Sequence, residues 1–295
     1  GLPKTGISAA IELESRAVEA GFSGVITLPG DQPTMSGEIG LKSADVADSL
    51  RLVGLRGVRA LQGRDLVLHA RVSAKGDSIE VADAALRLGS ASAEANGRIL
   101  RRDGRLDIDL KAKASNASLP ALLAIALGTG QGAAPAAGNI NSSGQSIWAD
   151  EAIDLAGIGE IGGKVRLNSD TLSIGQSMTL RHATLDLEVT PTAVEVKGLT
   201  GEALGGRVIV NARAEKSQSG IALTGTAKID GAQLDRIAVY LGAAPGASGT
   251  ASGTMAFSGG GLTPRGVIGT LSGTGNLQLK DARLSRFGAE ALEAA

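Results

Sequence analysis

The sequence predicts a mainly β protein, built of repeated antiparallel β-sheet units that short helices connect. Three observations lead to this fold class. Residues 104–113 read GRLDIDLKAK, in which oily and charged residues alternate with the period of two typical of a strand with one dry face. Glycine provides 43 of the 295 residues and is scattered through strand-like sequence, which is typical of bends and bulges in sheets. The chain also resembles itself at several places.

This internal repeat sets the order of the predicted elements. The stretch that starts at Gly97 aligns with the stretch that starts at Gly206, and a fainter copy starts at Gly24. Each copy reads glycine, strand, polar turn, strand and then a short apolar segment that ends in glycine. The match extends upstream of Gly97 and Gly206, so the repeating unit has about four or five strands and one short helix.

The repeat also divides the chain. The predicted segments are a worn or partial β repeat (1–60), a β repeat with a short helix at 119–127 (61–130), a flexible excursion followed by β-strands (131–180), a β repeat with a short helix at 234–241 (181–250) and the truncated start of a further β repeat (251–295). The Gly, Ala, Ser and Asn content of residues 128–145 predicts the excursion, and a similar tract follows the second helix at 242–253.

Turn and cap residues separate the elements. Turns are predicted at Lys75-Gly76-Asp77, Asp103-Gly104, Thr190-Pro191-Thr192 and Gln218-Ser219-Gly220. Helix N-caps are available at Asp48, Asn116 and Ser118, with Gly54 and Gly128 as stop residues. These signals favour meandering antiparallel sheet in which helices are brief interruptions.

Composition argues against several kinds of binding site. Phe, Trp and Tyr number 3, 1 and 1, so an apolar surface must be built from Leu, Ile, Val and Ala. The 29 Lys and Arg residues balance 30 Asp and Glu residues, which argues against nucleic acid as a partner. The absence of cysteine excludes disulfides, thiolate zinc ligands and a cysteine nucleophile.

Catalytic signatures are weak throughout. The glycine pattern of residues 157–162 runs into strand-like sequence instead of a helix, so it does not indicate dinucleotide binding. The two histidines, His69 and His182, lie far apart in sequence and are expected on the wet face of the strands. Asp107 and Asp109 are expected to be solvated carboxylates. We therefore predict a protein that is not an enzyme, with no catalytic residue, no metal site and no cofactor.

Residues 258–288 resemble a known family. A leucine, a Gly-x-Gly step, an alternating strand, an Asp-plus-small turn and another short strand follow one another there, at Leu271, Gly273, Gly275, Leu277, Leu279, Asp281, Ala282 and Leu284. This order is similar to the repeated C-terminal portion of the AsmA family of bacterial envelope proteins, which commonly has glycine where this chain has Ala282. The short apolar segments at 117–128 and 232–242 resemble the leucine-rich step of the same family.

The resemblance implies a large protein of a Gram-negative envelope, with its bulk in the periplasm and an inner-membrane anchor outside this segment. The chain starts with Gly instead of Met, which agrees with a segment of a longer protein. Repeating β-groove proteins of this type curl their sheets into an apolar channel that carries phospholipid between membranes. TamB-like members are tied to outer-membrane protein assembly. The resemblance thus implies an open groove, phospholipid acyl chains as cargo and outer-membrane assembly proteins as partners.

The residues themselves leave three options for an aliphatic sheet face, which are cover by a second sheet, closure into a barrel, or a trough filled by acyl chains. The positions expected to line a trough are Leu66, Leu68, Leu106, Ile108, Leu110, Leu185, Leu187, Val189, Leu277 and Leu279. The alternative is that these are ordinary core residues of a β-sandwich or β-solenoid, such as an adhesin passenger domain with a dry core.

Overall fold

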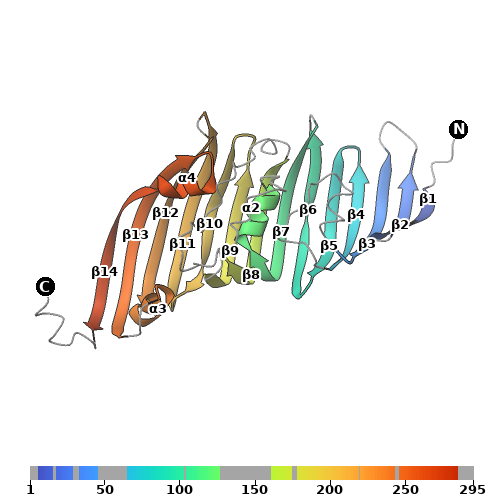
Figure 1. Cartoon of the computed structure of the whole chain (residues 1–295). Helices are drawn as coiled ribbons and strands as arrows, with labels where there is room; N and C mark the ends of the chain where they lie inside the picture. Colours follow the sequence, from blue (N-terminus) through green and yellow to red (C-terminus); the bar gives the residue numbers. More distant parts are fainter. Residues whose placement is uncertain are drawn as a thin grey trace, which may run out of the picture.

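A single sheet of fourteen strands forms the described part of the chain (Figure 1). The structure is a computed structural model, and it describes residues 6–15, 18–28, 33–45, 65–102, 104–126, 161–174, 178–218, 220–242 and 246–284. The strands are β1 (Ile7–Glu14), β2 (Val18–Thr27), β3 (Thr34–Ser43), β4 (Leu66–Lys75), β5 (Ser78–Leu88), β6 (Ala91–Arg102), β7 (Arg105–Ser118), β8 (Ile161–Ser173), β9 (Thr179–Val189), β10 (Ala193–Ala203), β11 (Gly206–Ser217), β12 (Gly220–Gln233), β13 (Ala247–Gly261) and β14 (Ser272–Leu284). The helices are α2 (Leu119–Ala126), α3 (Leu234–Tyr240) and α4 (Pro264–Gly269).

The order of strands in the sheet is the order along the chain, from β1 to β14. The predicted class, a mainly β and mostly antiparallel open sheet with a few short helices, is confirmed. The described strands do not form the alternative, a sandwich of two sheets or a solenoid. One pair departs from the predicted meander, because β7 and β8 run parallel, with Leu106 opposite Ile161 and Ser118 opposite Ser173.

The two predicted helices and the predicted turns at 75–77, 103–104, 190–192 and 218–220 stand where the sequence placed them, as far as they are described. Ser118 caps α2, since its hydroxyl oxygen accepts a hydrogen bond from the Ala121 amide at 3.4 Å. Asn116, the other cap candidate, contacts the hydroxyl of Thr171 on β8 instead. The predicted cap at Asp48, the stops at Gly54 and Gly128 and the excursion at 128–145 lie outside the described residues. The tract at 242–253 is partly strand, because β13 begins at Ala247.

Helix α4 was not predicted. It is only six residues long and contains two glycines, so its sequence has no helical periodicity. The Thr263 hydroxyl accepts a hydrogen bond from the Gly266 amide at 3.0 Å, and Pro264 occupies the first turn. Gly261 allows the close packing of α4 on β13, since a Cβ atom there would lie 2.8 Å from the Val267 nitrogen.

The Asp-plus-small step near the end of the chain is a bulge, not the predicted turn. Residues 272–284 form one continuous strand, and its register with β13 shifts where Gly249 faces Asp281 and Ala282. Asp281 has a φ of 52°, in the left-handed region. Similar residues stand at register shifts in β5, where Asp83 has a φ of 50°, and in β9, where His182 has a φ of 47°. At all three sites the residue in this conformation precedes an alanine, and the bulge bends the strand without ending it.

Glycines also make room for the few aromatic rings. A Cβ atom on Gly24 or Gly37 would lie 2.8 or 2.9 Å from the ring of Phe22, so this ring lies over Gly24 of its own strand and Gly37 of the adjacent strand β3. At the other end of the sheet, the ring of Phe257 lies in the same way over Gly225. These glycines therefore make room for aromatic rings, in addition to the bends that the composition predicted.

Candidate functional site

The pairing registers give the sheet two chemically different faces. One cross-strand row passes through all but the last strand as Ile11, Phe22, Ile39, Ala70, Ala84, Ala95, Ala112, Leu167, Leu185, Leu199, Val210, Ala227 and Met255, with a bulge between Ala70 and Ala84. Residues in register with this row form what we call the apolar face, and the alternate residues form the polar face. Because the same alternation continues from strand to strand, the apolar face is continuous across the sheet.

All ten residues that the sequence predicted as lining fall on the apolar face. Leu66 and Leu68 pair with Leu88 and Leu86 of β5. The three positions on β7 and the three on β9 align through β8, and the two on β14 pair with Ala251 and Gly253 of β13. The register therefore brings the ten residues onto one surface, although they are spread over four strands and more than two hundred residues of sequence.

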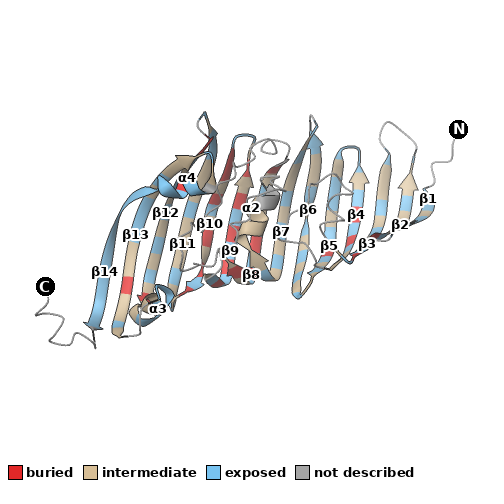
Figure 2. Cartoon of the chain, in the orientation of Figure 1, coloured by how far each residue is buried: buried red, intermediate tan, exposed pale blue. Residues whose placement is uncertain are grey.

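Burial differs along this face (Figure 2). In the middle, Leu185, Leu187 and Val189 are only 1%, 4% and 7% exposed. At the end near β14, Leu277 and Leu279 are 67% and 56% exposed. Leu106 is 41% exposed, and the remaining four, Leu66, Leu68, Ile108 and Leu110, are half-buried. The three β9 positions are thus buried in the core, whereas both β14 positions lie on the same face but are exposed to solvent.

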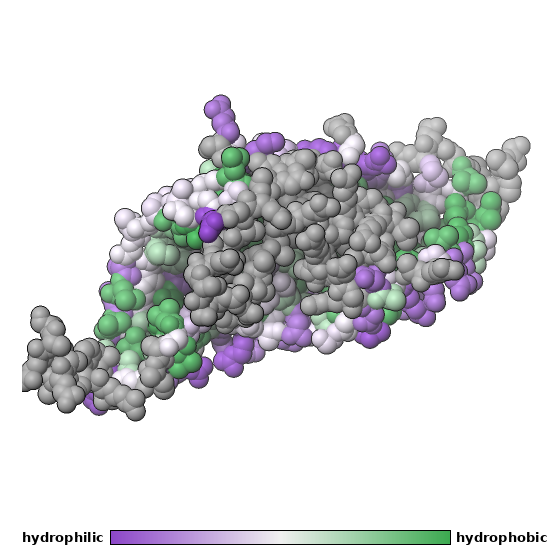
Figure 3. All heavy atoms as spheres, viewed as in Figure 1, coloured by the Kyte–Doolittle hydropathy of each residue, from purple (hydrophilic) through white to green (hydrophobic). Residues whose placement is uncertain are grey.

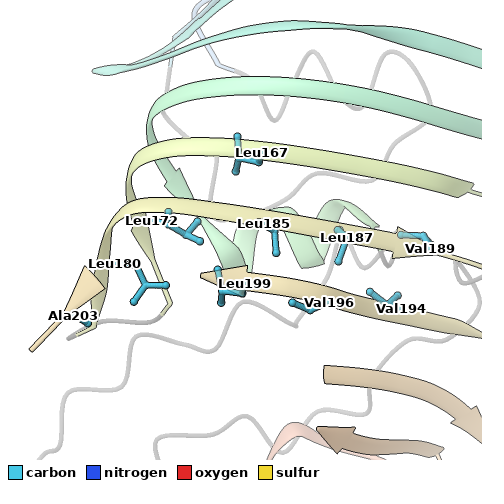
Figure 4. Close-up of a cluster of buried hydrophobic side chains, with 11 residues drawn as sticks. Leu167, Leu172, Leu180, Leu185, Leu187, Val189, Val194, Val196, Leu199 and Ala203 are labelled. Carbon is cyan, nitrogen blue, oxygen red and sulfur yellow. The ribbon is translucent and has the colours of Figure 1, made fainter. Parts of the chain in front are cut away.

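Helix α2 contributes to this central burial (Figure 4). Leu119, Leu122 and Leu123 pack against the cluster of buried side chains from β8, β9 and β10, which includes Leu172 and Leu180 at 0% exposure. Figure 4 shows the strands turning sharply near Leu172 and Leu180, so that they curl around the cluster. The middle of the apolar face is therefore packed by the chain itself.

The two ends of the face carry exposed apolar side chains (Figure 3). Ile7, Ile11 and Leu13 on β1 are 59%, 55% and 62% exposed, and Met255 on β13 is 46% exposed. Sequence reasoning did not assign these positions to the lining. The alternation of β1 (ISAAIELE) could have revealed them, but the first 60 residues resemble the repeat too weakly for that assignment.

The polar face is organised by cross-strand ion pairs. These pairs are Lys42–Glu19, Arg71–Asp83, Arg98–Glu80, Lys164–Glu188, Arg166–Asp186, Arg181–Glu202, Lys197–Glu188 and Arg213–Glu195. Nearly all of these side chains are well exposed, so solvent screening leaves each pair with little effect on stability. Their main effect is on register, because a slip of one residue would move the charges onto the apolar face.

Glu188 is the most enclosed member of this network. Its carboxylate contacts the ammonium group of Lys197 on β10 and lies 3.9 Å from the ammonium nitrogen of Lys164 on β8. Hydrogen bonding from Lys197 lowers the pKa of Glu188, although partial desolvation opposes this effect. The same hydrogen bond raises the pKa of Lys197. Both groups therefore stay charged at neutral pH and serve as a structural ion pair.

Two of the hollows on the polar face have volumes of about 970 and 750 Å³. The larger one is lined by the Arg98–Glu80 and Lys164–Glu188 pairs and by Asp107 and Asp109, so its charges largely neutralise one another. The smaller one is lined in part by His69 and His182, which are both exposed. Among the described residues no group of three or more His, Asp or Glu side chains is arranged to hold a metal ion.

Comparisons with known proteins give no family assignment. The chain matches no protein-family model, no curated protein and no solved structure. None of the helices in the described ranges has both the length and the apolar character that crossing a bilayer requires.

Proposed function

We propose that this chain is a periplasmic segment of an AsmA-like envelope protein that holds phospholipid acyl chains against the apolar face of its sheet. It carries these lipids between the inner and outer membranes, or assists outer-membrane assembly, without catalysing a reaction. An anchor outside this segment attaches it to the inner membrane, and outer-membrane assembly proteins are its partners. The observation that carries the proposal is the continuous aliphatic face with exposed side chains at both ends.

The chemistry of the face supports acyl chains as the ligand. Water in contact with apolar surface costs about 25 cal/mol per Å², so the exposed leucines and isoleucines favour an apolar occupant. Flexible aliphatic chains suit a surface of Leu, Ile, Val and Ala, because it has few rings against which a flat ligand could stack. A sugar or nucleic acid would lack its usual contacts on this face.

A second candidate is a structural domain with a dry core. The observation that favours it is the central cluster, where α2 packs on Leu185 and its neighbours without leaving them accessible. In this alternative the exposed ends are covered by protein in the same way as the middle. The two candidates differ in whether lipid is bound at the ends of the apolar face.

Lipid bound to the purified protein distinguishes them. The chain is isolated from a Gram-negative host without detergent, and organic extracts are analysed by mass spectrometry for phospholipid per mole of protein. Leu277→Asp should lower this ratio, because it places a charge on the exposed apolar face. Gln278→Asp is the matched control on the polar face of the same strand and should leave the ratio unchanged.

Either of two results would contradict the lipid proposal. One is a folded protein without phospholipid above the background of a control protein. The other is an equal loss of lipid in the two variants, which would mean that the apolar face does not hold it. The dry-core candidate predicts the first result.

A further inference from the structure

Two charged residues interrupt the apolar face. In the register of the paired strands, Arg101 faces Leu106 and Lys216 faces Ile221, so both cations occupy apolar-face positions. Every other Lys, Arg, Asp or Glu among the paired strand residues falls on the polar face or at a bulge. Two exceptions of the same sign in such a regular pattern require an explanation.

The two cations occupy corresponding places in the fold. Arg101 is the penultimate residue of β6, and Lys216 is the penultimate residue of β11. These are matching strands of the sequence repeat, which aligns the stretches from Gly97 and Gly206. Both strand ends lie at the edge of the sheet that carries the β6–β7 and β11–β12 turns, the upper edge in Figure 1, which we call the upper rim.

The surroundings of Arg101 combine charge with accessible aliphatic surface. Below it, Ile79, Ile99 and Ile108 form one cross-strand row, and Ile79 is 38% exposed. Its partner across the strands, Leu106, is 41% exposed. Arg101 is itself exposed and forms no ion pair with another described residue. A molecule with an apolar tail and an anionic end would match this arrangement.

The opposite rim lacks this feature. There the last apolar-face residues of the strands include Leu13, Ser43, Leu66, Leu88 and Ala203, and none of these is charged. Arg181 of β9 lies near this rim, but it lies beyond the bulge at His182 and faces Glu202 of the polar face. The apolar face therefore has a cationic rim and a neutral rim. An amphiphile lying across the strands would be oriented by this difference.

We propose that the upper rim binds the anionic headgroups of phospholipids, with Arg101 and Lys216 as the phosphate-binding residues. This inference rests on the proposed function and adds to it the class of lipid and its orientation. The acyl chains lie over the aliphatic rows, and the headgroup projects at the rim, where the long side chains of Arg and Lys reach phosphate oxygens while their stems stay on apolar surface. Net negative lipids are favoured over zwitterionic lipids with the same chains.

A competition experiment tests the preference. The protein is incubated with vesicles of equal parts phosphatidylglycerol and phosphatidylcholine with identical oleoyl chains, re-isolated and analysed for the ratio of the two bound lipids. Arg101→Gln should lower the preference for phosphatidylglycerol about fivefold, the effect of one cation at an anionic lipid surface. The double variant Arg101→Gln/Lys216→Gln should lower it further.

Arg102→Gln is the matched control, since Arg102 is the next residue, is exposed and points to the polar face. The amount of bound phosphatidylcholine reports whether each variant is folded and still holds acyl chains. Equal effects of Arg101→Gln and Arg102→Gln, or lipid binding without a preference, would overturn the headgroup site while leaving the lipid proposal standing. Absence of both lipids from the unmodified protein would overturn both.

Discussion

At the scale of single residues, the bends of the sheet depend on side chains in an unusual backbone conformation. His182 and Asp83 have φ near 50°, a region that costs an L-amino acid about 1–2 kcal/mol and that Gly, Asn and Asp tolerate best. Each precedes an alanine on the apolar face, Ala183 or Ala84, that is almost completely buried. The bulge thus lets a small residue fill the inside of the bend.

The strain at His182 gives a stability prediction. His182→Val should lower the free energy of unfolding by about 1–2 kcal/mol, because a β-branched residue fits the left-handed region poorly. His182→Gly should be neutral or stabilising, since the exposed contact with Glu202 at 3.6 Å contributes little. Urea denaturation followed by circular dichroism measures both changes.

Thr226→Val is the matched control for this prediction, as it introduces the same residue at an exposed polar-face position of β12 without a bulge. Its effect should stay within about 0.5 kcal/mol. A loss at Thr226 as large as the loss at His182 would show that valine on the polar face, and not the bulge conformation, causes the destabilisation.

At the scale of elements, the sequence predicts the features that local residue patterns determine, which are the positions of the helices and the two faces of each strand. Helices α2 and α3 are short apolar segments that follow alternating strands. The change of pattern predicts the bounds of both helices to within a residue or two. The direction of β8 relative to β7 was not predictable, because alternation fixes the faces of a strand but not its partner. Alternation also predicted that the ten expected lining residues share one face. Their different burial depends on the packing of α2, which no strand pattern contains.

This difference in burial can be measured with one substitution at two positions. Leu185→Ala, in the central cluster, should lower the free energy of unfolding of the lipid-free protein by about 2–5 kcal/mol. Leu279→Ala, on the same face but 56% exposed, should cost less than about 1 kcal/mol. Similar losses at the two sites would contradict a face that is packed in the middle and open at its β14 end.

At the scale of the whole molecule, two antiparallel runs of seven strands, β1–β7 and β8–β14, meet at one parallel pair. The apolar face passes through this junction without interruption, since Leu110 and Ala112 lie opposite Val165 and Leu167. The central claim is that the apolar face, and not the polar face, contacts lipid. Strand β7 lies at the junction and presents both faces within five residues, so it is the best place to test that claim.

The most direct measurement is site-specific photo-crosslinking in living cells. A photo-reactive residue is placed in turn at positions 106, 107, 108, 109 and 110 of the protein, and lipid adducts are identified by mass spectrometry. Adducts are expected at Leu106, Ile108 and Leu110 only, because neighbouring side chains of a strand point to opposite faces. Equal labelling at Asp107 and Asp109, or no lipid adduct at any of the five positions, would contradict the account.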